Sequence, residues 1–104
     1  MQLAIDIDKD KLRDFCRRWK ITELALFGSV TRPEEFRADS DVDVLVTFTA
    51  DAEWSLFDHV AMRYDLRELF SREVDLLTRR SVERSLNRFR REAILGTAVQ
   101  LDVA

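Results

Sequence analysis

The chain has 104 residues, a length typical of one domain, and its 17 Lys and Arg against 20 Asp and Glu give a net charge of −3 at pH 7. Two glycines and one proline leave no room for a Gly-rich dinucleotide-binding fingerprint or a P-loop. One cysteine and one histidine exclude a disulfide scaffold and a Cys/His zinc cluster, so any bound metal must be held by carboxylate oxygens.

Localisation is predicted from what the chain lacks. No apolar stretch approaches the roughly 20 residues of a transmembrane helix, and Asp6, Asp8 and Lys9 are unlike a secretory signal. The single Cys16 suits a reducing compartment. We expect a cytoplasmic protein in which residues 1–104 form a single domain.

The first elements follow from apolar spacing. Leu12, Phe15, Cys16 and Trp19 recur at helical intervals and predict an amphipathic helix over residues 9–20. The apolar run 24–27, ended by Gly28, predicts a buried strand. Residues 31–34, with a proline inside, predict a small capped turn.

The clearest strand is predicted over residues 43–49. Apolar residues alternate along it and form one face: Val42, Val44, Val46 and Phe48. Asp41 and Asp43 fall on the opposite face.

The second half predicts a helix, a strand, a helix and a final strand. Ser55 and Asp58 form a capping box that opens a helix to about residue 70, and residues 73–77 form a strand containing Asp75. Ser81 then caps a helix closed by Gly96, and residues 99–101 add an edge strand. The apolar stripe predicted for that last helix is Val82, Leu86, Phe89 and Ala93. This order favours an α/β (α+β) fold, a small mixed β-sheet with helices packed on one face.

Three aspartates are candidates for metal ligation. Asp41 and Asp43 lie two residues apart at the start of a strand, with Cα atoms roughly 6.6 Å apart, and Asp75 lies inside an otherwise apolar strand. Buried carboxylates repel one another unless a cation neutralises them, and oxygen ligands of this kind suit Mg²⁺. Alone, the Asp-x-Asp pair is more often a turn and a cap. Gly28 and Ser29, directly after an apolar strand, favour the functional interpretation because such a turn binds phosphate oxygens.

These residues resemble a known signature. Leu26-Phe27-Gly28-Ser29, eleven residues, and then Asp41-Val42-Asp43 are similar to the DNA polymerase β-like nucleotidyltransferase superfamily. The resemblance is closest to minimal nucleotidyltransferases, the MntA-type antitoxins paired with HEPN-domain toxins. Arg32 matches the usual arginine of this family, and Asp75 its third carboxylate. The spacer is commonly ten residues, and Pro33 stands where glycine or an acidic residue is usual.

The resemblance implies a mechanism with two Mg²⁺ ions and ATP as substrate. Asp41, Asp43 and Asp75 are the implied catalytic and metal-binding residues, and Gly28, Ser29 and Arg32 the implied nucleotide-binding residues. It also implies the acceptor: a tyrosine hydroxyl of a HEPN-family ribonuclease toxin, which receives AMP and is neutralised. We expect a hetero-oligomer with that toxin, and no stable binding to nucleic acid or membrane.

Alternatives remain at this level. The eleven-residue spacer favours a catalytically inactive antitoxin that neutralises its toxin by binding only. A small-molecule nucleotidyltransferase is disfavoured because 104 residues leave no second domain for its acceptor. The basic last helix is either a solvated face, a docking site for an acidic partner or a group that closes over nucleotide phosphates; its arginines are Arg79, Arg80, Arg84, Arg88, Arg90 and Arg91.

Overall fold

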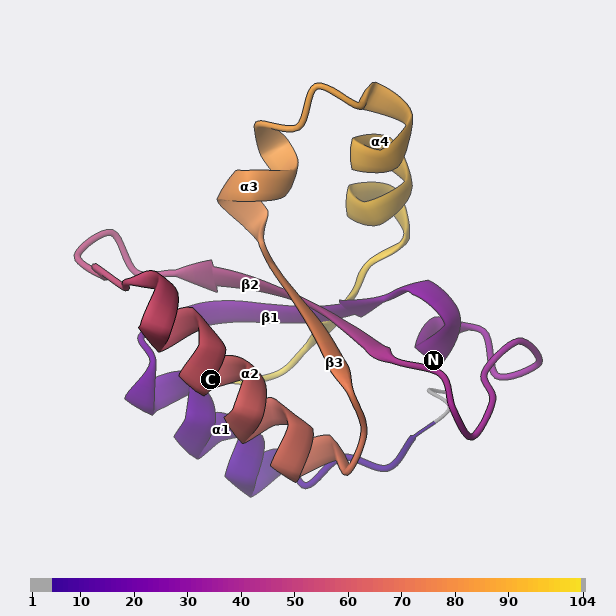
Figure 1. The fold of residues 1–104 in the computed structure, drawn as a ribbon, viewed down its shortest axis with the longest axis horizontal. Coiled ribbons are helices and arrows are strands. Elements are labelled where there is room, and N and C mark those ends of the chain that lie inside the picture. The colour runs from indigo at the N-terminus through magenta and orange to yellow at the C-terminus, as the bar shows by residue number, and fades with distance from the viewer. Residues whose placement is uncertain (1–4, 104) are drawn as a thin grey trace.

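Four strands form one mixed sheet in the order β3-β2-β1-β4 in the computed structural model, which describes residues 5–103 (Figure 1). The strands are β1 (Ile21–Phe27), β2 (Val42–Phe48), β3 (Val74–Thr78) and β4 (Val99–Leu101). Strand β1 pairs antiparallel with β2 and β4, whereas β2 and β3 are parallel and are joined through a helix. The predicted mixed sheet of an α+β fold is thus confirmed, including the short edge strand β4.

One face of the sheet is covered by α1 (Lys9–Arg18) and α2 (Leu56–Phe70), which lie below it in Figure 1. The apolar face predicted for β2 points into this layer, where Val42, Val44 and Val46 are buried. Asp8 caps α1, and Ser55 and Asp58 form the predicted capping box of α2. This layer contains the main hydrophobic core of the protein.

The other face carries α3 (Arg79–Glu83) and α4 (Arg88–Thr97), which stand above the sheet in Figure 1. The prediction that all helices pack on one face is therefore wrong. The opposite face is itself apolar near its centre, because Ala25, Phe27 and Leu45 lie there. Val82 and Ile94 cover these side chains and form a second, smaller cluster with them.

The last predicted helix is divided in two. Thr78, not Ser81, caps α3, and Asn87 caps α4 by accepting a hydrogen bond from the Arg90 amide. The predicted stripe is wrong at Leu86 and Phe89, which are 101% and 84% exposed, and at Ala93, which is also exposed. The break over residues 84–87 rotates the second helix relative to the first, so one helical periodicity cannot describe both.

Two further boundaries differ from the prediction. Gly96 does not end α4, because the helix continues to Thr97. The helical turn expected at residues 31–34 begins earlier, as the short 3-10 helix η1 (Gly28–Thr31), and a hydrogen-bonded turn over residues 32–35 follows it.

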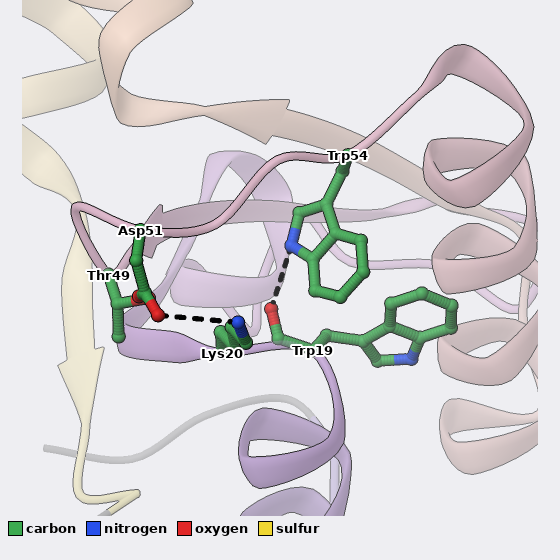
Figure 2. Close-up of polar contacts among 5 residues, drawn as sticks. All are labelled: Trp19, Lys20, Thr49, Asp51 and Trp54. Carbon is green, nitrogen blue, oxygen red and sulfur yellow. Dashed lines mark hydrogen bonds and ion pairs between the residues drawn. The ribbon is translucent and has the colours of Figure 1, made fainter.

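A pair of tryptophans connects the end of α1 to the segment before α2 (Figure 2). Trp54 donates from Nε1 to the Trp19 carbonyl over 3.0 Å, and the two rings meet edge to face with centroids 5.2 Å apart. Lys20 Nζ pairs with Asp51 3.3 Å away at the same junction. Over residues 5–103, no helix combines the length and the hydropathy that crossing a bilayer requires.

Candidate active site

Adjacent parallel strands bring two of the predicted carboxylates side by side. Asp43 in β2 is the direct register partner of Asp75 in β3. Asp41 is exposed and lies just before β2, and the Val42 amide donates to the Glu73 carbonyl over 2.9 Å. That bond extends the strand pairing to the position next to Asp41, so the three acidic residues share one end of the β2–β3 pair.

Gly28 lies directly against Asp43. Strand β1 pairs Phe27 with Asp43, and Gly28 follows with a φ of +74°, a conformation that favours glycine. A Cβ on Gly28 would lie 2.2 Å from the Asp43 Oδ2 atom. Only glycine therefore lets this turn and this carboxylate approach so closely.

The electrostatics of the site centre on Asp43. The pKa of this carboxyl is raised from 3.8 to about 6, first by burial and then by the negative charges of Asp75 and Asp41. Arg32 and Arg90 act in the opposite sense and lower the pKa. The carboxylates are thus close enough to repel one another, which is the situation that a bound cation relieves.

The donor set fits a hard divalent cation, since it offers three carboxylates and a half-buried Asp43 with unrelieved repulsion. The three aspartate side chains do not converge on one point. Within residues 5–103, no three Asp, Glu, His or Cys side chains converge into a metal-binding group.

The predicted phosphate-binding residues lie in and after η1. Ser29 is the second residue of this turn and is partly exposed, and Thr31 Oγ1 donates to the Gly28 carbonyl over 2.7 Å. Arg32 is exposed, and its Nε atom donates to the Glu35 carboxylate. The Arg32 guanidinium therefore contributes positive charge near Asp43 while it remains paired with a neighbour.

The long spacer between Ser29 and Asp41 forms a loop held by Arg72. The Arg72 guanidinium donates to the carbonyls of Arg37 and Ala38 over 3.0 and 3.1 Å, and it stacks over the Phe36 ring at 4.4 Å. The extra residue lies in this loop, since Gly28 still contacts Asp43.

The sequence identifies Arg90 only as one of six arginines in the basic last helix, whose role it leaves open between a solvated face, a docking site and closure over nucleotide phosphates. Arg90 belongs to α4, which covers the sheet face that carries Asp43, and its charge lowers the pKa of that carboxyl. The available signal was the run of arginines in this segment. A single helix with the predicted stripe did not place Arg90 beside the strand carboxylates.

Comparison with known proteins agrees with these features. Residues 9–98 match the family model described as nucleotidyltransferase domain. "Putative protein adenylyltransferase MJ0435" of Methanocaldococcus jannaschii is 34% identical over 93 residues, which are 89% of this chain and 92% of that protein. A solved structure described as a putative minimal nucleotidyltransferase is 32% identical, with a TM-score of 0.68, and covers 89% of this chain and 88% of that one.

More distant structures share the fold. A toxin–antitoxin crystal structure with AMP-PNP superposes with a TM-score of 0.69 at 22% identity, covering 94% of this chain and 75% of the other. A tri-AMPylated Shewanella oneidensis HEPN toxin in complex with its MNT antitoxin gives a TM-score of 0.60 at 20% identity, covering 92% and 70%. The chain belongs to the nucleotidyltransferase domain family, as a minimal nucleotidyltransferase of the DNA polymerase β-like superfamily.

Proposed function

We propose that this chain is a Mg²⁺-dependent nucleotidyltransferase antitoxin that transfers AMP from ATP to a tyrosine hydroxyl of a HEPN-family toxin. The observation that carries the proposal is the contact of the Gly28 turn with Asp43, beside Asp75 on the neighbouring strand. In this proposal the Gly28 turn binds the triphosphate next to the carboxylates that hold the cations. Relatives described as protein adenylyltransferases, and a neighbour solved with an AMPylated HEPN toxin, support the choice of reaction.

Each site residue has a role in this reaction. Asp41, Asp43 and Asp75 hold the divalent cations, which neutralise phosphate charge and lower the pKa of the attacking hydroxyl when bound. Ser29 and the amides of η1 bind the β- and γ-phosphates. Arg32 turns from Glu35 to the triphosphate, because a polyphosphate carries more negative charge than a single carboxylate.

The transfer itself is an in-line displacement at the α-phosphorus. The acceptor oxygen forms a bond to this phosphorus while the bond to the bridging oxygen breaks, and pyrophosphate leaves. The hydroxyl proton passes to water. The chain's contribution is to position the reactants and balance their charge, which accounts for most of the catalysis in phosphoryl transfer.

Neutralisation by binding only is the second candidate, and the eleven-residue spacer is the feature that favours it. The loop structure argues for catalysis instead. Arg72 donates hydrogen bonds to three backbone carbonyls of the spacer, at residues 37, 38 and 40. The Gly28 turn lies directly against Asp43.

A labelling experiment separates the two. The protein, Mg²⁺, ATP labelled at the α-phosphate and a HEPN-family toxin are incubated, and label on the toxin is followed with time. We expect Asp43→Asn to lower the rate at least 100-fold, because it removes a metal ligand, while Asp39→Asn in the exposed loop labels normally. Wild-type labelling by Asp43→Asn would refute the mechanism. Protection of cells by an Asp43→Asn variant that labels nothing would establish binding only.

A further inference from the structure

The segment formed by residues 79–97, called here the α3–α4 arm, differs in charge from the rest of the chain. It carries six arginines and two glutamates, a net charge of +4, whereas the other 85 residues carry −7. Arg88 pairs with Glu92 over 3.0 Å, and Arg91 donates to the Ser85 carbonyl. The other four arginines make no ion pair within 4.0 Å among residues 5–103: Arg79, Arg80, Arg84 and Arg90.

The arm also exposes two large apolar side chains between these charges. Leu86 is fully exposed in the connection between α3 and α4, and Phe89 is 84% exposed in the first turn of α4. Val82 and Ile94 are the only buried apolar residues of the arm, and they pack it against the sheet. An exposed aromatic side chain flanked by arginines, with no lysine, has the composition of a protein-binding surface, and Leu86 adds apolar area to it.

The arm stands beside the candidate active site. Helices α3 and α4 cover the sheet face that carries Asp43, and Figure 1 shows their connection at the end farthest from the sheet. Helix α3 begins directly after β3, four residues beyond Asp75, and Ile94 of α4 shares a cluster with Phe27 and Leu45. A macromolecule bound along the arm therefore lies on the same face of the sheet as Asp43.

We propose that the α3–α4 arm is the docking surface for the protein acceptor, and that it binds an acidic segment with an apolar pocket for Phe89 and Leu86. This inference rests on the proposed function and adds the surface that brings the acceptor hydroxyl to Asp43. Unpaired arginines complement acidic side chains, and the exposed apolar pair supplies the burial that anchors a complex. A long nucleic acid fits less well, because the −7 charge on the rest of the chain repels it.

A second exposed apolar stripe, on α2, lacks this complementarity. It consists of Leu56, Phe57, Val60 and Tyr64. Its neighbouring arginines are already engaged, since Arg63 donates to the Val74 carbonyl over 2.9 Å and Arg67 pairs with Glu73 over 3.1 Å. Helix α2 also lies on the sheet face opposite the arm (Figure 1). The stripe therefore provides a matched control.

The test compares three double variants. Leu86→Ser with Phe89→Ser removes the apolar pair of the arm, and Arg80→Ser with Arg84→Ser removes two of its charges. Leu56→Ser with Phe57→Ser makes a similar change on α2. All six side chains are exposed, so the variants retain the wild-type melting temperature, which is checked first.

We expect each arm variant to raise the KM for the HEPN toxin at least tenfold in the labelling assay, with the KM for ATP unchanged. The α2 variant keeps both values. Unchanged KM for the toxin in the arm variants, or a rise confined to the α2 variant, overturns the inference.

Binding measured without ATP separates this inference from the proposed function. If the wild-type protein labels no toxin, the proposed function fails, and titration calorimetry with the toxin still decides the inference. Tenfold weaker binding of the arm variants supports it, and equal or absent binding overturns it. A fluorescent 20-nucleotide single-stranded RNA is titrated in parallel. Loss of RNA binding in the arm variants with unchanged toxin binding assigns the arm to RNA and overturns the inference.

Discussion

Asp43 is the residue at which stability and the proposed chemistry conflict most directly. Burial and two neighbouring carboxylates raise its pKa to about 6. The folded protein therefore binds a proton at Asp43 more tightly than the unfolded chain does. At neutral pH the ionised carboxylate therefore destabilises the fold when no cation is bound. A residue chosen only for stability would be uncharged here.

We predict that Asp43→Asn raises the melting temperature at pH 7.5 in the presence of EDTA. A shift of two pKa units corresponds to about 3 kcal/mol, which solvent screening of this half-buried group reduces to about 1 kcal/mol. That is about 5 °C in melting temperature for a domain of this size. Thermal unfolding followed by circular dichroism measures it, with Asp39→Asn as the exposed control.

The pH dependence of this gain has a definite sign. The folded-state pKa of Asp43 is raised, so its destabilising effect is present above about pH 6 and fades as the pH falls toward 3.8. The advantage of Asp43→Asn should therefore shrink when the melts are repeated at pH 5. A gain that stays constant from pH 5 to 7.5 contradicts the assigned cause.

Sequence reasoning was strongest for residues whose chemistry conflicts with their surroundings. Asp43 and Asp75 are acidic residues in apolar strands, and Gly28 ends such a strand, so all three attract attention without a structure. The structure places them side by side. Arg90 has no such conflict, because an arginine in a basic helix looks solvated until the packing of that helix is known.

At the scale of elements, the two glycines differ in whether their positions would accept a side chain. Gly28 has a positive φ and no room for a Cβ, whereas Gly96 lies inside α4 with open space around it. We predict that Gly28→Ala destabilises the protein by about 2 kcal/mol, from backbone strain and displacement of the Asp43 carboxylate, and lowers the labelling rate at least tenfold. Chemical denaturation and the labelling assay measure the two effects.

Gly96→Ala is the matched control for the same change. Alanine favours helix over glycine, so this variant should gain about 0.5 kcal/mol and keep its labelling rate. Equal behaviour of the two variants would mean that the turn does not constrain the site.

The helix whose start is marked by a capping box was predicted well. The last helical segment, which contains several residues able to cap a helix, was not. The helix opened by Ser55 and Asp58 begins where expected because its capping box fixes the start, although four of its apolar side chains are exposed. The prediction of one last helix failed because Asn87 starts a new helix. Thr78 and Ser81 are both residue types that cap helices well, and the structure uses Thr78.

At the scale of the whole molecule, the tryptophan pair connects the end of α1 to α2 and to the segment just before it. Trp54 donates to the Trp19 carbonyl, and Trp19 Nε1 donates to Asp65 in α2 over 3.0 Å. We predict that Trp54→Phe costs about 1 kcal/mol, because it leaves that carbonyl without its donor and loses ring contact. Thermal unfolding measures the loss.

Phe57→Leu is the control for this aromatic substitution, since its side chain is 86% exposed and its loss should not change the melting temperature. An unaffected Trp54→Phe variant would show that the junction is held by other contacts, such as the Lys20–Asp51 pair in Figure 2.

The parallel pairing of β2 and β3 has a consequence for the order of folding. Parallel neighbours need a crossover, here α2, so Asp75 reaches Asp43 only after this helix has packed beneath the sheet. Contacts of such sequence separation form late, because closing a long loop costs entropy before the pairing repays it. Nascent or partly unfolded chains carry the Asp41–Asp43 pair without the third carboxylate. Under the proposed mechanism, a chain that has not finished folding would therefore lack the third metal ligand and transfer no AMP.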